Sequence, residues 1–392
     1  MNTLHFPRAK LASDYADELL GKRALSDAPN GLFLTGVRRT GKSAFLRFDL
    51  IPALTTHGVL ALYVDLLTNK KLQPMEVVRQ ALQQAVVDNL PAIERFVKKA
   101  GMDKIGLPGV FGVDLRNIGN IEALSLYQVF ELLARARGGK PIALIIDEAQ
   151  QALTSDEDDT LMWALKSARD QMKTPSGANL LLVMSGSHTD KLTLLLGTPR
   201  APFWGSQVRA LPLLGDDFVE AQAAALRQAQ PTLATVRTSE LVRAFEQFGR
   251  RPQFFLAAAG EAAASSHDAQ AFEAALVARS QRQTAADYQR YSDAFLALPA
   301  LEQAVLERII TEGRQFRAFD AKALAFYAQR TGKAKVTAAA VQRAVEALRA
   351  NEEDLVWKSL RGDYAIYDQG LITWHACLVA QRAWPPTVAP SG

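Results

Sequence analysis

The stretch Gly36-Val37-Arg38-Arg39-Thr40-Gly41-Lys42-Ser43 fits the pattern G-x-x-x-x-G-K-[ST] of a phosphate-binding P-loop. Before it, Gly31–Thr35 is a short apolar run that predicts a buried strand, and the residues that follow have the apolar spacing of a helix. Strand, glycine-rich loop and helix in this order form the context that the motif requires. The N–H groups of such a loop point inward at a phosphate, and the helix N-terminus adds partial positive charge.

Lys42 and Ser43, which end the motif, carry the side chains that a nucleoside triphosphate and its metal require. Lys42 is expected to reach the β- and γ-phosphates of ATP, and the Ser43 hydroxyl is expected to ligate Mg²⁺. The rest of the loop is expected to bind the nucleotide: Gly36, Val37, Arg38, Arg39, Thr40 and Gly41. The alternative is a glycine-rich turn with a solvated lysine. The flanking strand and helix favour the nucleotide site.

A second motif follows an apolar run of the kind found in a central strand. Lys140–Ile146 leads into Asp147-Glu148, the Walker B pattern, which presents acids at the carboxyl end of a strand. Asp147 is expected to hold Mg²⁺ through water, and Glu148 is expected to polarise the attacking water as a general base. An apolar run before two acids is a common strand ending by itself. Its combination with a P-loop favours ATP hydrolysis.

Polar residues at two further strand ends are candidates for completing the site. Ser185 and Ser187 end a buried strand predicted over 179–187. A polar side chain here can sit between the Walker B acids and the γ-phosphate, and Ser185 is the predicted catalytic one. The alternative is that both serines cap the next helix. Asp65 ends a strand predicted over 58–65, where it either faces the phosphates or serves as a turn residue.

Four arginines are candidates for a finger or sensor that contacts the γ-phosphate. Arg200 and Arg209 lie in a segment, 197–214, that is expected to run from a loop into a short strand. Arg250 and Arg251 lie in a turn where a glycine ends one helix and a proline begins the next. An arginine at that helix start can reach back to the γ-phosphate, and Arg250 is the predicted catalytic one. Each of the four is otherwise a solvated surface residue.

The composition is that of a folded chain in a reducing compartment. At 392 residues the chain is too long for one ordinary core, so two or three domains are expected. Apolar residues make up 48% and charged residues 22%, which is typical of globular proteins. The single Cys377 excludes an intramolecular disulfide framework and favours the cytoplasm. No apolar run has membrane-spanning length and Met1–Arg8 lacks the order of a signal peptide, so no membrane contact is expected.

Strand and helix patterns divide the chain into three predicted domains and a tail. Residues 1–214 are an α/β domain of P-loop NTPase type, a parallel sheet with helices on both faces and an insertion at about 66–138. Strand signals then vanish, and alanine-rich helical patterns predict an all-helical lid over 215–292. Three amphipathic helices and a β-hairpin predict a carboxy-terminal winged-helix domain over 293–383. The tail 384–392 is expected to be disordered.

The predicted winged helix carries basic residues that can contact DNA phosphates. They are Lys333, Lys335, Arg343 and Arg349 in or just before its third helix, and Lys358 and Arg361 in its wing. Nearby acids, among them Glu346, dilute this positive field, and winged helices also serve purely as protein contacts. The whole chain has a formal net charge of only +4, which is weak support for nucleic-acid binding. Double-stranded DNA and a protein partner therefore both stay open.

Together, these residues resemble the P-loop ATPases of the AAA+/STAND type, especially the archaeal-ATPase-like group with a C-terminal winged helix. The P-loop of that group reads G-x-R-R-x-G-K-[ST], which Gly36–Ser43 matches. Arg38 and Arg39 make the resemblance more specific, because phosphate binding alone does not demand them. The resemblance implies ATP and Mg²⁺ as ligands and an ATPase activity that is slow or stimulated by a partner.

Looser similarities extend over most of the chain. Ser185-Gly186-Ser187, the turn Gly249–Pro252 and the strand and helix over Tyr364–Ala380 look like the corresponding segments of that group. The entry motif, usually rich in Gly, Arg and Glu, departs from the group and appears only as Phe6-Pro7-Arg8. The separation of the two Walker motifs is also long.

The first hypothesis is a Mg²⁺-dependent ATPase whose nucleotide state reorients the lid and winged helix and so passes a switch to DNA or a protein partner. The alternative is a winged-helix DNA-binding regulator with ATP as a slow structural ligand. Intact Ser43, Asp147 and Glu148 argue against this alternative. A third hypothesis is a homo-oligomer in which one subunit supplies an arginine finger to its neighbour. The sequence leaves the oligomeric state and the pathway open.

Overall fold

The computed structural model describes residues 5–36, 39–69, 72–99, 104–105, 113–114, 121–153, 156–174, 177–178, 180–187, 192–193, 195–196, 201–351, 355–358, 364–366 and 368–386. The chain forms two compact units, Met1–Leu213 and Leu214–Gly392. Each unit has its own hydrophobic core. Among the described residues, none of the helices has both the length and the apolar composition needed to span a membrane.

A five-stranded parallel sheet is the centre of the first unit, with strand order β2-β5-β8-β1-β9. The strands are β1 (Leu32–Thr35), β2 (Leu60–Asp65), β5 (Ile142–Asp147), β8 (Leu180–Gly186) and β9 (Val208–Ala210). All residues of β1, β5 and β8 are buried, as expected for parallel strands covered on both faces. Because the strands are parallel, the P-loop after β1 lies at the same edge as the Walker B acids after β5.

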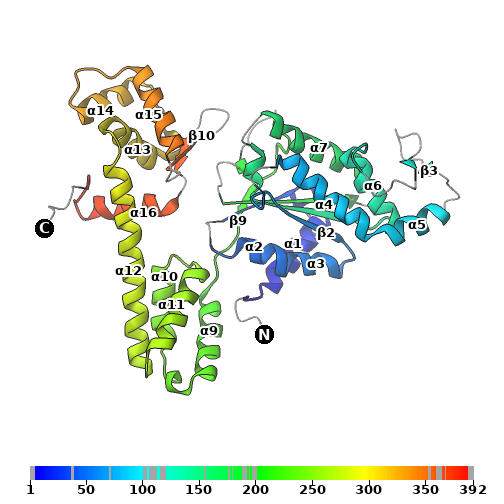
Figure 1. The fold of residues 1–392 in the computed structure, drawn as a ribbon, viewed down its shortest axis with the longest axis horizontal. Helices are drawn as coiled ribbons and strands as arrows, with labels where there is room; N and C mark the ends of the chain where they lie inside the picture. Colours follow the sequence, from blue (N-terminus) through cyan, green and yellow to red (C-terminus); the bar gives the residue numbers. More distant parts are fainter. Residues whose placement is uncertain are drawn as a thin grey trace. The chain divides into compact units, whose positions relative to one another are not determined.

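Helices cover both faces of this sheet (Figure 1). One face packs on α1 (Ala9–Leu19), α2 (Lys42–Phe45), the π-helical turn η2 (Leu46–Leu50) and α3 (Ile51–Thr56). The other face packs on α4 (Pro74–Asp88), α6 (Leu126–Ala136) and α7 (Asp156–Met172), with α5 (Leu90–Lys99) against α6.

The sheet thus separates two hydrophobic cores, and the side chains of β5 alternate between them, as the period of a strand requires. Ala143 and Ile145 belong to the core beneath α1 and α3. Ile142, Leu144 and Ile146 belong to the core beneath α4, α6 and α7. β5 is therefore held from both sides up to the residue before Asp147.

The segment 66–138, expected as an insertion, contributes to the main core of the first unit. Val78 and Leu82 of α4 and Val129 and Leu133 of α6 are buried in the same cluster as alternate residues of the strands. α4 and α6 therefore form the crossover between the neighbouring strands β2 and β5. Within this segment, β3 (Lys104–Ile105) pairs with β4 (Val113–Asp114), and the other residues of 101–120 lie outside the described part.

Shorter elements complete the first unit. They are the 3₁₀ helices η1 (Ala28–Asn30) and η4 (Ala149–Leu153) and the antiparallel pair β6 (Lys173–Thr174) and β7 (Gly177–Ala178). η4 directly follows the Walker B acids, so the chain turns sharply away from the sheet edge after Glu148, whose φ is +54°. A positive φ is uncommon for a non-glycine residue and is often found at functional positions.

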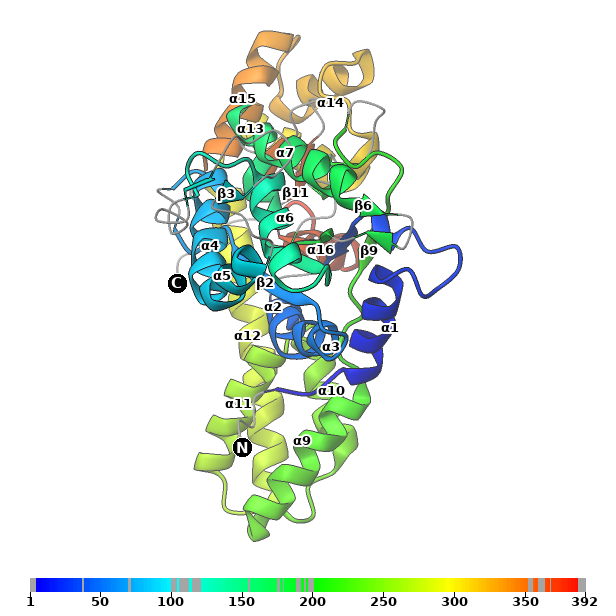
Figure 2. The same cartoon turned by 90° about the vertical axis from the view of Figure 1, so that its right-hand side faces the viewer.

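The second unit begins with a helical bundle, as the loss of strand signals predicts. Its helices are α9 (Asp216–Ala229), α10 (Thr238–Gln247), α11 (Pro252–Ser265) and α12 (Ala269–Leu296), with η5 (Pro231–Leu233) between α9 and α10. α10 and α11 pack along α12, the long helix that Figure 2 shows from a second direction. The boundary predicted between residues 292 and 293 falls inside α12, which is continuous. The division of this unit into a lid and a winged-helix domain stays a prediction.

Three helices and a hairpin follow α12 in the order of a winged helix. They are α13 (Ala300–Glu312), α14 (Ala321–Thr331), α15 (Ala338–Ala350), β10 (Val356–Lys358) and β11 (Tyr364–Ile366), with η6 (Gly313–Gln315) after α13 and α16 (Gln369–Ala380) after the hairpin. The Asp320 and Thr337 side chains accept hydrogen bonds from the first turns of α14 and α15 and fix where these helices begin. The winged helix expected from the sequence is therefore present.

Trp384, expected to begin a disordered tail, packs against the second unit. Its ring centroid lies 4.8 Å from that of Phe295 and 4.3 Å from that of His375. The boundary at residue 384 is therefore wrong, because a tryptophan that finds aromatic neighbours gains from leaving water. Residues 387–392 lie outside the described part of the chain.

Replacing Phe245 with alanine is expected to destabilise the second unit by about 3–5 kcal/mol, the usual cost of deleting a buried aromatic ring. Phe245 is fully buried, and its ring centroid lies 5.1 Å from that of Phe218 and 5.2 Å from that of Phe255. Chemical denaturation measures the loss. Phe319→Ala is the matched control, because Phe319 is 43% exposed. Equal losses for the two variants would contradict the assignment of this core.

Candidate nucleotide site

The P-loop joins β1 to a helical run that continues from Lys42 to Thr56 through α2, η2 and α3. The Gly36 N–H donates to the Gly186 carbonyl at 3.2 Å and so ties the start of the loop to β8. Gly41 has φ +89°, a conformation that favours glycine, at the point where the helix begins. Thr40 is buried and Arg39 is exposed, while Val37 and Arg38 lie outside the described residues.

Lys42 lies between the two Walker B acids. Its Nζ is 3.1 Å from Asp147 Oδ1 and 3.2 Å from Glu148 Oε1. The Lys42 side chain is 6% exposed and that of Asp147 is 1% exposed, so this pairing is screened little by water. The structure thus brings the two motifs together although they are more than a hundred residues apart in the chain.

The Asp147 carboxylate accepts hydrogen bonds on both oxygens. Besides Lys42, Oδ1 accepts the Ser185 hydroxyl and the Glu148 N–H, and Oδ2 accepts the Ser43 hydroxyl at 2.5 Å. Burial by itself would raise the pKa of Asp147. The Lys42 charge and the serine hydroxyls outweigh burial and hold that pKa below its usual value. Asp147 therefore stays ionised, as a ligand for a divalent cation must.

The Glu148 carboxylate is held by a second set of donors. Its Oε2 accepts the Gln150 amide and, at 3.1 Å, the Ser187 hydroxyl. Gln150 is buried and crosses the end of β8 at Gly186, where a Cβ atom would overlap the Gln150 side-chain oxygen. A glycine between Ser185 and Ser187 thus leaves the room that Gln150 needs to reach Glu148.

Ser185 and Ser187, the two candidate serines at the end of β8, both contact the Walker B acids. Ser185 is fully buried and donates to Asp147, and Ser187 donates to Glu148. The residues expected to start the next helix lie partly outside the described part, so the capping alternative stays open. The catalytic role of Ser185 stays a prediction.

Two residues of β2, Asp65 and Tyr63, lie beside Asp147 at this sheet edge but belong to neither Walker motif. Asp65 is opposite Asp147 in the register of β2 and β5. Burial, followed by the charges of Asp147 and Glu148, raises the pKa of Asp65. Tyr63, two residues earlier, donates its hydroxyl to Asp147 Oδ2 at 2.9 Å. Nothing in the sequence of a strand marks such a tyrosine as different from a core residue.

Arg8 connects the entry segment to the P-loop. Its guanidinium donates to the Gly41 carbonyl at 3.2 Å and to the Pro212 carbonyl at 3.0 Å. It also lies 4.7 Å from the ring centroid of Phe45. Burial lowers the pKa of Arg8, and the negative charge of the nearby Asp49 partly offsets this shift. The departure of Phe6-Pro7-Arg8 from the family pattern signalled an unusual entry segment but not this contact.

The four candidate arginines have different surroundings. Arg209 pairs with Glu18 at 2.5 Å and with Asp27, which commits it to an ion-pair network beside β9. Arg250 pairs with Asp216 at 3.0 Å and with Glu246 at 3.1 Å.

Arg251 completes the described candidates, and its guanidinium lies 5.6 Å from the ring centroid of Phe254. Arg200 lies outside the described residues. A finger or sensor role for any of the four, including the catalytic role expected of Arg250, stays a prediction.

The oxygen atoms around Ser43 and Asp147 fit a Mg²⁺ ion. A serine hydroxyl and an ionised carboxylate are hard ligands, and Mg²⁺ is usually held by one or two such groups together with substrate phosphates. In the part of the chain that the structure describes, no group of three or more His, Cys, Asp or Glu side chains is arranged to hold a metal ion. Ser43 and Asp147 are the residues that would hold Mg²⁺ together with the phosphates of the nucleotide.

A comparison with protein families places the same residues in an ATPase domain. Residues 18–189 match the model of the family described as an ATPase domain predominantly from Archaea. This segment runs from α1 to the end of β8 and includes both Walker motifs and the serines that contact them. No protein with a curated description matches the chain.

Several solved structures are similar to the chain over nearly its whole length. The ADP form of the Aeropyrum pernix ORC2 protein is 14% identical, with a TM-score of 0.50, and the match covers 96% of this chain and 93% of that one. The Aeropyrum pernix ORC1 protein in complex with DNA is 15% identical, with a TM-score of 0.41, over 97% of this chain and 95% of that one. At such identities the likeness supports the fold alone.

The motifs, their geometry, the family match and the fold define the class of the protein. The first unit carries a P-loop ATPase domain, and the second unit carries a C-terminal winged helix.

Proposed function

We propose that the chain hydrolyses ATP in a Mg²⁺-dependent reaction at Lys42, Ser43, Asp147 and Glu148, and that the nucleotide state changes the arrangement of the second unit. The observation that carries the proposal is the position of Lys42 Nζ, within 3.2 Å of both Walker B acids. A lysine so placed lies next to the base that activates water and the acid that serves the metal.

Each of these side chains has a distinct part in the proposed reaction. Lys42 leaves the acids for the β- and γ-phosphates, which attract it more strongly because they carry more negative charge. Glu148, released from Lys42 but still held by Gln150 and Ser187, accepts a proton from the attacking water. Bound Mg²⁺ supplies neutralisation of the charge that develops on the phosphate oxygens.

In this scheme the departure of Lys42 leaves Glu148 Oε1 free to accept a hydrogen bond from the attacking water. ATP binding would therefore both place the substrate and activate the base. Ser185, buried beside Asp147, is proposed to keep that acid in place while Lys42 moves.

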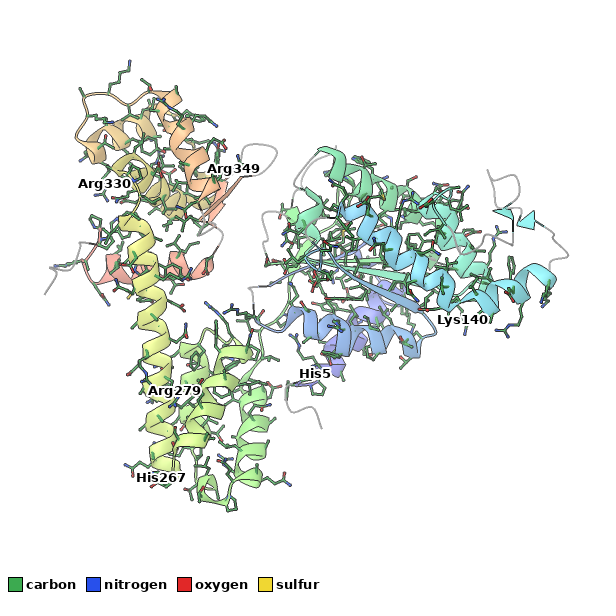
Figure 3. All side chains as sticks on the ribbon, in the orientation of Figure 1. His5, Lys140, His267, Arg279, Arg330 and Arg349 are labelled. Atoms are coloured by element: carbon green, nitrogen blue, oxygen red, sulfur yellow. The ribbon has the colours of Figure 1, made fainter. Side chains whose placement is uncertain are left out.

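The second unit is proposed to pass the nucleotide state to double-stranded DNA or to a protein partner. A winged helix is a common DNA-binding module, and Lys333, Lys335 and Arg343 make no ion pair with other described residues. Arg330 and Arg349, labelled in Figure 3, are instead paired with Glu307 and Glu346. The first group favours DNA over a protein partner, because cations with no acidic partner among the described residues are available to phosphates.

Replacing Lys333, Lys335 and Arg343 together with glutamate is expected to weaken binding of duplex DNA by about tenfold or more and to flatten its salt dependence. Fluorescence anisotropy at several salt concentrations measures both. The matched control replaces the exposed Arg95, Lys98 and Lys99 of α5 with glutamate, which changes the net charge equally. Equal effects of the two triple variants would show that only net charge matters and would remove the winged helix as the DNA site.

A turnover assay with and without duplex DNA tests the proposed function. If the proposed function is right, we expect the chain to release phosphate from ATP in a reaction that requires Mg²⁺ and is stimulated by DNA. The alternative, a DNA-binding regulator with ATP as a slow structural ligand, expects nucleotide binding with no turnover in either condition. The single cysteine, Cys377, is free and favours a cytoplasmic location for either function.

An assembly in which neighbouring subunits share a site is a further part of the proposal. Arg200 is the better candidate for a finger supplied by a neighbour, because Arg209 is engaged with Glu18 and Asp27. Mixing Arg200→Ala subunits with Lys42→Ala subunits tests it, since shared sites restore part of the activity. A mixture that is as inactive as either variant alone would contradict sharing.

A further inference from the structure

Tyr63 contacts the Walker B aspartate from the neighbouring strand. β2 and β5 pair in parallel with Tyr63 opposite Ile145 and Asp65 opposite Asp147. This register lets the tyrosine hydroxyl reach along the sheet edge and donate to Asp147 Oδ2 at 2.9 Å. Because the Asp147 side chain is 1% exposed, few water molecules compete for that oxygen.

The two oxygens of Asp147 have different donors. Oδ1 accepts Lys42, Ser185 and the Glu148 N–H. Oδ2 accepts only Ser43, at 2.5 Å, and Tyr63 among the described residues. Oδ2 is therefore the oxygen beside the serine that the P-loop pattern assigns to the metal, and Tyr63 shares it.

We propose that Tyr63 is a positioning residue for the metal site, whose hydroxyl holds Asp147 Oδ2 in the orientation that the Mg²⁺ of bound Mg·ATP requires. This inference rests on the proposed function. If Ser43 were to ligate Mg²⁺, its hydrogen bond to Oδ2 would be lost, and Tyr63 would remain as the donor on that oxygen. Without it, the carboxylate is fixed only through Oδ1.

The Tyr63 side chain is suited to this part because its position is fixed. The ring packs against the core that includes Phe45 and Ile145, and the Arg47 guanidinium lies 5.5 Å from its centroid. The hydroxyl is therefore held beside Asp147 Oδ2 by the packing of its own ring.

The Tyr63→Phe variant tests the proposal, because it removes the hydroxyl and keeps the ring. Binding of a fluorescent ATP analogue is measured in EDTA and across a Mg²⁺ titration. In EDTA the affinity is expected to stay within about twofold of the wild type, since no phosphate contact changes. The Mg²⁺ concentration at the midpoint of the titration is expected to rise about tenfold, as for loss of a hydrogen bond to a charged group.

Tyr127→Phe is the matched control. Tyr127 is another partly buried tyrosine of the first unit, but it packs on the opposite face of the sheet. Its variant is expected to keep both the affinity in EDTA and the Mg²⁺ midpoint of the wild type. Asp147→Asn is the positive control and is expected to shift the midpoint further than Tyr63→Phe.

Two results would overturn the proposal. One is an unchanged Mg²⁺ midpoint in Tyr63→Phe. The other is an equal loss of ATP affinity in EDTA and in Mg²⁺. That result would mean that Tyr63 supports the fold and not the metal site, and it is also the result expected if the variant does not fold. A wild-type chain that binds no ATP in either condition defeats the proposed function as well, so the two failures are distinguishable.

Discussion

Replacing Lys42 with alanine is expected to raise the Kd for ATP by about a hundredfold or more, because it removes two charge-assisted hydrogen bonds of ~1.5–3 kcal/mol each. The Lys42 side chain is 6% exposed and already points at the site, where it contacts Asp147 and Glu148. Its side chain is therefore directed by the fold to the place where the phosphates are to bind. Equilibrium binding of a fluorescent ATP analogue measures the effect.

The same substitution is also expected to lower the stability of the fold, and this effect has to be separated from the loss of ATP affinity. Without Lys42, Asp147 and Glu148 lose their shared cation, and a buried carboxylate without a counter-charge is costly. The variant is therefore expected to unfold at a lower temperature, and binding is to be measured well below that temperature. Lys140→Ala is the control, since Lys140 lies just before the amino end of β5 and is exposed (Figure 3). Wild-type affinity in a folded Lys42→Ala chain would contradict the site.

Replacing Glu148 with glutamine is expected to lower the rate of ATP hydrolysis by about a hundredfold or more while leaving ATP binding within a few-fold of the wild type, because a general base contributes roughly 10²–10⁴. The amide cannot accept the proton of the attacking water. It has nearly the same shape as the carboxylate, so the contacts with Gln150 and Ser187 can be kept in part.

Phosphate release and nucleotide binding are to be measured on the same preparation of this variant. Glu94→Gln on α5 is the matched control, because Glu94 is exposed and outside the site. It is expected to keep the wild-type rate. Hydrolysis by Glu148→Gln at the wild-type rate would show that another group activates the water, and the base assignment would then be wrong.

The sequence predicted the centre of the site because its chemistry is encoded locally. Eight consecutive residues, Gly36–Ser43, form a motif whose usual context is a strand before it and a helix after it. The acids Asp147 and Glu148 directly follow an apolar run. Parallel strands then bring both to one sheet edge, without further information. For the same reason the parallel sheet and the winged helix could be predicted from patterns of apolar residues.

Contacts that depend on strand register or on packing could not be predicted. Tyr63 looks like any aromatic residue of a buried strand until β2 is paired with β5. Gln150 needs both the turn after Glu148 and the space at Gly186 to reach its partner. Trp384 follows the last helix without any periodicity, so nothing marked it as part of a core. Each depends on residues distant in the chain.

The nucleotide that remains bound after a single incubation shows whether this site hydrolyses ATP. Wild-type and Glu148→Gln chains are incubated with a small excess of Mg·ATP and freed of unbound nucleotide, and the nucleotide that stays bound is identified. We expect ADP and released phosphate for the wild type and intact ATP for the variant. Intact ATP on both chains, or ADP on both in equal yield, would contradict this expectation.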